Sequence, residues 1–361
     1  MSKSLIILGS TGSIGQQTLD LVREFSRQFK IIGLAGGQNS GLLQKQIREF
    51  QPKFFFTSSG GVRSLLGCKS LPLEKLAAQK CDLVVSAISG VAGLAPTLAA
   101  IRAKNSVALA NKESLVLAGK IVMSEAKKSG VKILPIDSEH SAVWQLLKKV
   151  PKNKVKRIIL TASGGALRDT PLRDFPKIAP AKVLNHPTWA MGAKITLDCA
   201  TLANKAFEII EAAHLFDFPL EKISAVIHPQ SLVHALVETV DGNFFAQISR
   251  PSMKLPISLA LFDGERQSGL IQKLDLTRQN LEFRPIEKAR YPLFFTILDV
   301  AKRGGIFPAA VAASSEFFGQ KFLAGEIAFP EIAKLTAKSL RAIRHKPANL
   351  KNIMAVVNSF R

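Results

Sequence analysis

Two groups of polar residues in this sequence have the types and spacing of a metal or phosphate site. In the first, Asp137 and Glu139 follow the apolar run 131–136 and lie two residues apart. If the chain stays extended there, both carboxylates point to the same side, because side chains alternate along a strand. Carboxylates without nearby Cys or paired His select a hard cation such as Mg²⁺ or Mn²⁺. The pair therefore predicts a divalent metal site.

The second group lies in the stretch 196–215, whose apolar spacing predicts one long helix. Asn204 and Lys205 are four and three residues before Glu208, so a helix presents the three as one polar patch. An amide, an ammonium and a carboxylate together suit a phosphate or a metal-bound oxyanion. Spacing alone leaves simpler interpretations open. Lys205 and Glu208 could form a surface ion pair, and the acidic pair after residue 136 could cap a following helix.

A glycine-rich turn near the N-terminus has the pattern of a dinucleotide site. Residues 5–15 predict a buried strand, a turn with Gly9, Gly12 and Gly15, and the start of a helix. Such glycines let the backbone approach a pyrophosphate, which the free amides of the helix N-terminus receive. The spacing is GxxGxxG, a variant of the usual GxGxxG. The next turn, residues 35–39, has no carboxylate for a ribose 2′-hydroxyl, which favours NADP over NAD.

The elements that must position these residues alternate through the first part of the chain. Short apolar runs predict strands at 5–8, 31–35, 54–56, 83–87, 106–110 and 131–136. Helical spacing occurs between them at 16–25, 41–50, 96–104 and 121–128. This alternation predicts an α/β fold, with a Rossmann-like parallel sheet over residues 1–136.

The remainder of the chain has a different pattern. Predicted strands at 155–160, 223–227 and 244–248 are separated by Gly- and Pro-bearing loops. We therefore expect a central α+β domain over 137–269, which carries both polar groups. Residues 270–291 are polar and irregular and predict a linker, and residues 292–361 have the spacing of a C-terminal helical bundle.

Charge and composition restrict the class of protein. The chain of 361 residues carries 49 Lys plus Arg against 27 Asp plus Glu, a formal net charge of +22. Such an excess suggests the hypothesis that the protein binds nucleic acid. However, the densest basic run, Lys148 to Arg157, has no interleaved aromatics, so we favour a solvated loop and strand edge. Apolar runs are far shorter than the ~20 residues of a membrane span. The chain has only 3 cysteines, which fits a reducing compartment, so we expect it to be cytoplasmic. Together with the basic run and the short apolar runs, this predicts that it binds neither nucleic acid nor membrane.

A set of motifs, taken together, resembles the 1-deoxy-D-xylulose 5-phosphate reductoisomerase family. In the family's order they are GSTGSIG (9–15), ANKES (110–114), PIDSEH (135–140), TASGG (161–165), HPTWAMG (186–192), ANKAFE (203–208) and IHPQS (227–231). The resemblance implies an NADP-dependent oxidoreductase, which rearranges and reduces that substrate to 2-C-methyl-D-erythritol 4-phosphate in non-mevalonate isoprenoid precursor biosynthesis. It also implies NADPH, Mn²⁺ or Mg²⁺, and a homodimer. The first domain would then bind NADPH, and the central domain would bind metal and substrate.

The resemblance assigns roles residue by residue. The metal ligands would be Asp137, Glu139 and Glu208, which with Lys112 form the catalytic set. The substrate would be bound by Lys112, Ser138, Glu139, Ser163, His186, Trp189, Cys199, Asn204, Lys205 and Glu208. The cofactor would be bound by Thr11, Gly12, Ser13, Ile14, Gly37, Gln38, Asn39, Asn111, Glu113 and Gly192. Residues 186–192 would form a flexible loop that closes over the substrate.

This chain departs from the family's pattern at two positions. Cys199 stands where the family usually has a phosphate-binding serine, and a thiol is the weaker hydrogen-bond donor, which lowers the expected phosphate affinity. Gln38 stands where a basic residue often neighbours the 2′-phosphate. We expect His228 to line the floor of the site. Two alternatives are weighed against the family: another two-domain Rossmann-fold dehydrogenase, of the homoserine or semialdehyde type, and a basic nucleic-acid-binding protein.

Overall fold

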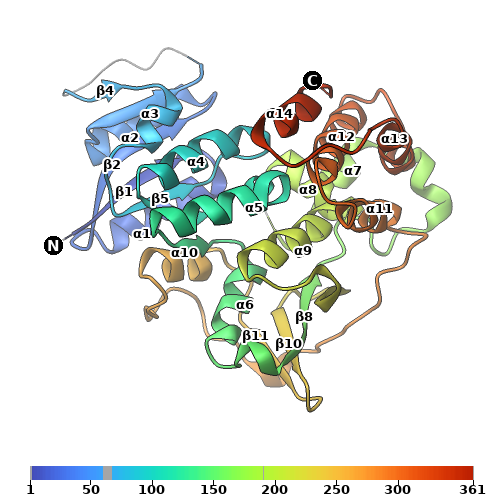
Figure 1. Ribbon diagram of the computed structural model, residues 1–361. Coiled ribbons are helices and arrows are strands. Elements are labelled where there is room, and N and C mark those ends of the chain that lie inside the picture. The colour runs from blue at the N-terminus through green and yellow to red at the C-terminus, as the bar shows by residue number, and fades with distance from the viewer. Residues whose placement is uncertain (1, 60–66, 190, 361) are drawn as a thin grey trace. The chain divides into compact units, whose positions relative to one another are not determined.

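The computed structural model describes residues 2–59, 67–189 and 191–360. The chain folds as two compact units, each assembled from segments that are distant in sequence (Figure 1). The first unit is built from Met1–Ser114, Lys120–Ser141 and Ser252–Gln272. The second is built from Leu115–Gly119, Ala142–Pro251 and Lys273–Arg361. Within the described ranges, no helix is long and apolar enough to cross a membrane.

The first unit contains a parallel seven-stranded sheet in the order β4-β3-β2-β1-β5-β6-β7. Its strands are β1 (Lys3–Leu8), β2 (Phe29–Gly36), β3 (Phe54–Thr57), β4 (Lys69–Ser70), β5 (Leu83–Ser86), β6 (Ser106–Leu109) and β7 (Ile133–Pro135). The residues from Leu5 to Leu8 are completely buried, as expected where helices cover both faces of a parallel sheet. The order reverses beside β1, and ligands of such sheets bind beyond the strand carboxyl ends at this reversal.

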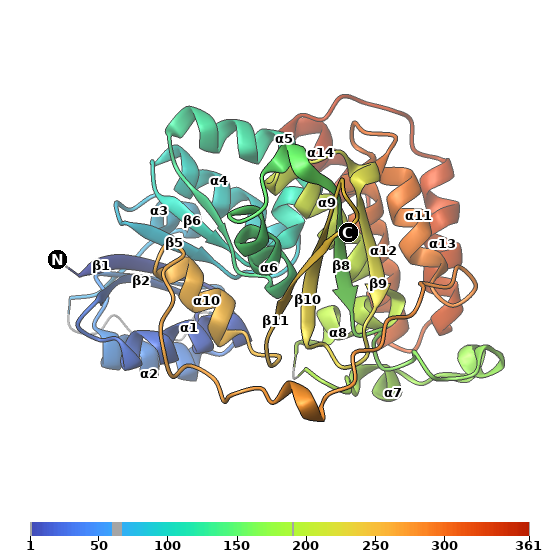
Figure 2. The ribbon, with the colours of Figure 1, turned by 90° about the horizontal axis from the view of Figure 1, so that it is seen from below.

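Helices from two parts of the chain cover this sheet. They are α1 (Ser13–Glu24), α2 (Ser40–Phe50), α3 (Leu73–Ala77), α4 (Leu94–Arg102), α5 (Lys112–Ser129) and α10 (Lys254–Leu261). Helix α10, gold in Figure 2, packs against α1 although it comes from much later in the sequence. Just after α10, the ring of Phe262 makes edge contacts with Phe25 and Phe29 at centroid distances of 5.1 and 5.0 Å. This late helix therefore completes the core of the first unit.

The second unit contains a mixed sheet in the order β11-β10-β8-β9. Its strands are β8 (Val155–Ala162), β9 (Ile223–Ile227), β10 (Val233–Thr239) and β11 (Phe244–Ile248). Strands β8 and β9 are parallel, whereas β10 is antiparallel to both β8 and β11. The loops that follow β8 and β9 consequently leave the sheet at the same edge.

The helices of the second unit form two groups. Helices α7 (Pro180–Leu184), α8 (Ala193–Thr201) and α9 (Ala203–Leu215) follow β8, and α9 packs on β8 and β9. Helix α6 (Ser138–Leu147) begins in the first unit and ends in the second. The C-terminal bundle consists of α11 (Pro292–Ala301), α12 (Phe307–Leu323), α13 (Phe329–Arg341) and α14 (Leu350–Asn358), with α12 packed on the other three. The predicted fold class is confirmed.

Three local predictions are wrong. The helix expected over 196–215 is two helices, broken at Leu202, whose left-handed φ of 56° ends the hydrogen-bond ladder of α8. The extended backbone expected at Asp137 is the start of α6, whose first carbonyl acceptor is that of Asp137, bonded to the Ser141 N–H at 2.8 Å. A helix does follow the acidic pair, as the open alternative required, but capping of that helix by either carboxylate stays a prediction. The basic run is solvent-exposed as predicted, but its last residues lie in β8, which is an inner strand and not an edge.

Candidate functional site

The glycine turn joins β1 to α1 and is shaped by contacts that exclude side chains. Gly9 has a φ of +90°, and a Cβ atom there would lie 2.5 Å from the Ala87 carbonyl oxygen. A Cβ atom on Gly15 would overlap the Gly9 carbonyl. Gly12 is exposed and occupies the N-cap position of α1. Gly9 and Gly15 therefore permit the turn, whereas Gly12 leaves the amides of the α1 N-terminus open to an anion.

The predicted cofactor residues after β2 lie beside this turn. Leu8 of β1 is in register with Ala35 of β2, so both turns leave the sheet together. Gly37, Gln38 and Asn39 are exposed. The Asn39 side chain caps α2 by accepting the Leu42 N–H at 3.0 Å. Because β1 and β2 are neighbours, a pyrophosphate at the start of α1 would lie one strand away from this cap.

Asn111 and Glu113, predicted to contact the cofactor, are buried at the start of α5. The Asn111 side chain caps this helix by accepting the Ser114 N–H at 3.0 Å. Its amide donates to the Gly90 carbonyl and to a Glu113 carboxylate oxygen, both at 2.9 Å. Gly93 permits this arrangement, because a Cβ atom there would lie 2.6 Å from the Asn111 Cγ. These contacts fix the loop that follows β6.

The acidic residues of the first unit lie where β7 ends. Lys112 Nζ forms an ion pair with Asp137 Oδ2 at 2.6 Å, and the two side chains are only 8% and 16% exposed. The Ser138 hydroxyl donates to Glu139 Oε2 at 2.7 Å. The structure thus brings Lys112, Ser138 and both carboxylates to the carboxyl edge of the parallel sheet. Two carboxylates at this edge fit a hard divalent cation.

The polar patch of the second unit lies on the first turns of α9. Asn204 Nδ2 donates to Glu208 Oε1 at 2.5 Å, and Lys205 Nζ pairs with Glu208 Oε2. All three residues are less than a tenth exposed. The surface-pair interpretation is therefore wrong. Burying a carboxylate and an ammonium is costly unless both are hydrogen-bonded, as they are here.

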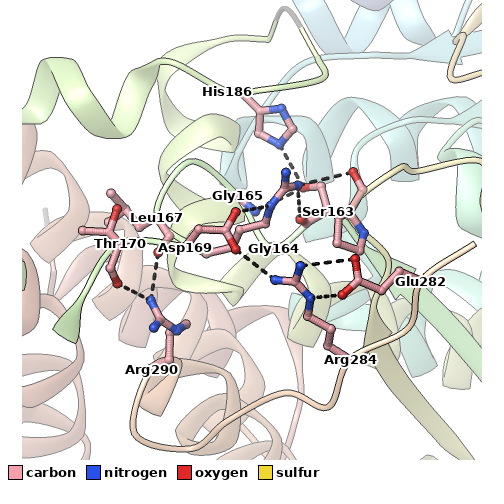
Figure 3. Close-up of polar contacts among 12 residues, drawn as sticks. Ser163, Gly164, Gly165, Leu167, Asp169, Thr170, His186, Glu282, Arg284 and Arg290 are labelled. Carbon is pink, nitrogen blue, oxygen red and sulfur yellow. Dashed lines mark hydrogen bonds and ion pairs between the residues drawn. The ribbon is translucent and has the colours of Figure 1, made fainter. Parts of the chain in front are cut away.

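Ser163 follows β8 and is held by His186 (Figure 3). His186 Nδ1 accepts the N–H groups of Thr188 and Trp189 at 3.1 and 3.0 Å, so the ring proton lies on Nε2. That Nε2–H donates to the Ser163 hydroxyl at 3.0 Å, and the Gly165 N–H donates to the same oxygen at 3.2 Å. The hydroxyl accepts twice, so its own hydrogen can be donated to an anion.

The electrostatics of this cluster favour a neutral imidazole. Burial lowers the pKa of His186, and the positive charge of Arg168 lowers it further. A neutral ring is also what the geometry requires, because protonated Nδ1 could not accept the two backbone N–H groups. His186 therefore orients the Ser163 hydroxyl as a neutral donor.

A double-glycine turn places Cys199 beside this serine loop. Gly164 and Gly165 have φ values of 84° and 69°. A Cβ atom on Gly165 would lie 2.6 Å from both the Ala200 Cα and the Cys199 carbonyl oxygen. The loop therefore lies directly against the backbone of α8. Trp189 is half-buried; the adjacent residue 190 of the predicted loop lies outside the described residues.

Sequence reasoning missed the residues that support the loop. A charged chain next to this loop is formed by Arg168, Asp169, Glu282 and Arg284. Figure 3 shows Arg284 between Asp169 and Glu282. Tyr291, the only tyrosine of the chain, donates to the Gly164 carbonyl at 3.0 Å, and burial raises its pKa to about 12. The sequence offered one signal for these residues: Tyr291 is its single tyrosine, and a tyrosine hydroxyl usually finds a hydrogen-bond partner when buried.

His228 lies at the end of β9, next to the serine loop. Its ring is fully buried and stacks on Phe283 at a centroid distance of 4.9 Å. Its Nδ1 is 2.8 Å from the Glu282 carbonyl oxygen, and burial lowers its pKa. These contacts attach the irregular segment before α11 to the strand end. A position on the site floor stays a prediction.

Family models match most of the chain. Residues 5–119 match the model described as 1-deoxy-D-xylulose 5-phosphate reductoisomerase, and residues 133–216 match that family's C-terminal domain. Residues 248–361 match the DXP reductoisomerase C-terminal domain. The reductoisomerase of Chlorobium phaeobacteroides is 45% identical over 96% of this chain and 93% of its own length. That of Thermodesulfovibrio yellowstonii is 40% identical over 99% of this chain and 96% of its own length.

Solved structures show the same similarity. The reductoisomerase of Zymomonas mobilis in complex with NADPH aligns with a TM-score of 0.91 and 35% identity, covering 100% of this chain and 97% of that chain. A DOX-P reductoisomerase in complex with NADPH, fosmidomycin and magnesium aligns with a TM-score of 0.93 and 35% identity, covering 99% and 96%.

Proposed function

The chain belongs to the 1-deoxy-D-xylulose 5-phosphate reductoisomerase family, and from that premise we propose how its own residues perform the family's reaction. The activity is the NADPH- and divalent-metal-dependent rearrangement and reduction of 1-deoxy-D-xylulose 5-phosphate to 2-C-methyl-D-erythritol 4-phosphate. This is a step of non-mevalonate isoprenoid precursor biosynthesis. The full-length similarity does not favour a homoserine- or semialdehyde-type dehydrogenase, or a nucleic-acid-binding protein. The structural observation that carries the residue assignment is the buried Glu208 carboxylate, held by Asn204 and Lys205.

The cofactor is assigned to the open N-terminus of α1 and the turns beside it. Thr11, Gly12, Ser13 and Ile14 would receive the pyrophosphate, since the first-turn amides of α1 favour an anion. The other proposed contacts are Gly37, Gln38, Asn39, Asn111, Glu113 and Gly192. When bound, NADPH supplies the hydride. The caps made by Asn39 and Asn111 hold two of these turns in shape before the cofactor arrives.

The divalent metal is assigned to Asp137, Glu139 and Glu208, an all-oxygen donor set that suits Mg²⁺ or Mn²⁺. When bound, the metal supplies Lewis-acid polarisation of the substrate oxygens. Lys112 orients the Asp137 carboxylate and would donate to a substrate oxygen, as would Ser138. Asn204 and Lys205 fix both oxygens of Glu208.

The substrate phosphate is assigned to the serine loop and the start of α9. The Ser163 hydroxyl has a hydrogen to donate, and His186 sets its direction. Asn204 and Lys205 add an amide and an ammonium, and Cys199 lies against the same loop. Trp189, held through its backbone N–H by His186, would cover the reacting carbons and exclude water.

We also propose that the protein is a cytoplasmic homodimer. The edge strand β11 of the mixed sheet carries Phe244 and Phe245, which are 53% and 46% exposed. Adjacent residues of a strand point to opposite faces, so apolar surface borders this edge on both sides. Two copies that pair along such an edge would satisfy its backbone groups and cover these rings.

One assay tests the activity. Purified protein supplied with Mn²⁺ or Mg²⁺ and NADPH is expected to lose absorbance at the NADPH wavelength on addition of 1-deoxy-D-xylulose 5-phosphate. The methylerythritol phosphate should appear in equal amount. Parallel runs with NADH measure the effect of Gln38. No substrate-dependent oxidation with either nicotinamide would sink the proposal.

A further inference from the structure

We propose that Arg168 is a positioning residue for the phosphate site, joining the two loops that leave the mixed sheet at its carboxyl edge. The inference rests on the phosphate assignment of Ser163 made above. It adds a residue with no assigned role, whose side chain contacts the backbone of the site and not the reacting atoms. Its contacts tie the backbone of the serine loop to the loop that follows β9.

The first observation is a bridge between neighbouring strands. Strands β8 and β9 are parallel and in register from Ile158 and Ile223 to Ala162 and Ile227. Arg168 Nη1 donates to the Ser163 carbonyl at 3.0 Å and to the Pro229 carbonyl at 3.3 Å. One nitrogen therefore binds the loop after β8 and the loop after β9.

The second observation is a brace that fixes the guanidinium. Asp169 accepts from Arg168 Nε at 3.0 Å on one oxygen and from Arg284 Nη1 at 2.9 Å on the other. Arg284 also donates to both oxygens of Glu282, at 2.5 and 3.2 Å. Backbone hydrogen bonds in both directions attach Arg284 to Ile227 at the end of β9. The brace therefore connects the loop after β8, through Asp169, to the end of β9, through Arg284.

The third observation is electrostatic. The side chain of Arg168 is only 21% exposed, so its charge is less screened than that of a surface arginine. This charge acts on the His186 ring, which contacts the Ser163 hydroxyl. An anion that accepts from this hydroxyl would lie in the same field. Arg168 would thus attract the phosphate and hold the loop that binds it.

The test compares three variants with a matched control. Arg168→Met removes the charge and the bridge, Arg168→Lys keeps the charge without the Nε donor, and Asp169→Asn weakens the brace. Arg173→Met removes an equal charge from an exposed site nearby. We expect Arg168→Met to raise the substrate KM about tenfold and the inhibition constant of inorganic phosphate in proportion. Arg168→Lys and Asp169→Asn should be intermediate, and Arg173→Met should match the wild type.

The affinity for NADPH separates positioning from general damage, because all the proposed cofactor residues except Gly192 lie in the first unit. It should stay within about twofold of the wild type in every variant. If Arg168→Met does not fold, Arg168→Lys and Asp169→Asn still have to raise the KM. A normal KM in all three variants, with a raised KM in Ser163→Ala, would overturn the role of Arg168 alone. A normal KM in Ser163→Ala as well would overturn the phosphate assignment.

Discussion

The Lys112 ammonium lies 2.6 Å from the Asp137 carboxylate, and both groups sit at the carboxyl ends of neighbouring parallel strands. The pair holds one predicted metal ligand in place, and the Ser138 hydroxyl does the same for Glu139. Ligands that are already oriented lose less conformational entropy when a cation binds. These contacts would therefore lower the entropic cost of binding at the proposed metal site.

Glu208→Gln is expected to abolish turnover while NADPH binding survives. The amide keeps the size of the side chain but loses the negative charge that a divalent cation requires. Titration with NADPH and a steady-state assay measure the two effects, with the exposed Glu221→Gln as control. Normal turnover in Glu208→Gln would remove Glu208 from the metal site.

Cys199→Ser is expected to lower the KM for the substrate. A hydroxyl is a stronger donor than a thiol, and the backbone of this residue lies against the serine loop. Steady-state kinetics at saturating NADPH give the answer. A higher KM would contradict the assignment of Cys199 to the phosphate.

Gly165→Ala is expected to raise the KM and to destabilise the protein. Left-handed backbone strain alone costs about 1–3 kcal/mol, and the new Cβ would also lie 2.6 Å from Ala200 Cα. Gly242→Ala is the matched control, since Gly242 has a φ of +86° and no atom of the described chain lies near its Cβ position. Thermal unfolding and kinetics should show strain in both variants and a KM effect in the first. Equal KM values for Gly165→Ala and Gly242→Ala would refute the close packing of the serine loop against α8.

His186 is expected to titrate below the ordinary histidine value of about 6.5. Burial lowers its pKa, so its neutral contacts stabilise the fold fully above that value, and this contribution falls as the pH drops toward the folded pKa. NMR titration of labelled histidines, assigned with a His186→Asn variant, measures the shift. Arg168→Met should move this pKa upward, because the second cause is then removed. A pKa at or above the ordinary value would contradict the neutral ring.

Charged residues on β11 are expected to dissociate the proposed dimer. Phe244→Glu and Phe245→Glu place carboxylates at an edge that pairing would bury. Leu172→Glu, at a similarly exposed leucine elsewhere in the second unit, serves as control. Sedimentation velocity over a range of concentrations reports the mass. A wild-type chain that stays monomeric would disprove the dimer itself.

The sequence predicted the structure correctly where residues that are adjacent in the sequence determine it. Strand runs such as Leu5 to Leu8 and the polar spacing of Asn204, Lys205 and Glu208 gave correct predictions. The break at Leu202 was not predictable, because apolar residues continue through both helices and no Gly or Pro marks their junction. The Arg168 bridge was also not predictable. It depends on the pairing of β8 with β9, which are separated by more than the whole of α8 and α9.

The late position of α10 has a consequence for biosynthesis. Phe25 and Phe29 leave the ribosome early, but their partner Phe262 follows the whole segment Ala142–Pro251. Chains are made from the N-terminus at about 5–20 residues per second, so the apolar surface of these rings stays uncovered for tens of seconds. Nascent chains stalled before residue 254 are therefore expected to bind a chaperone more tightly than the complete chain does.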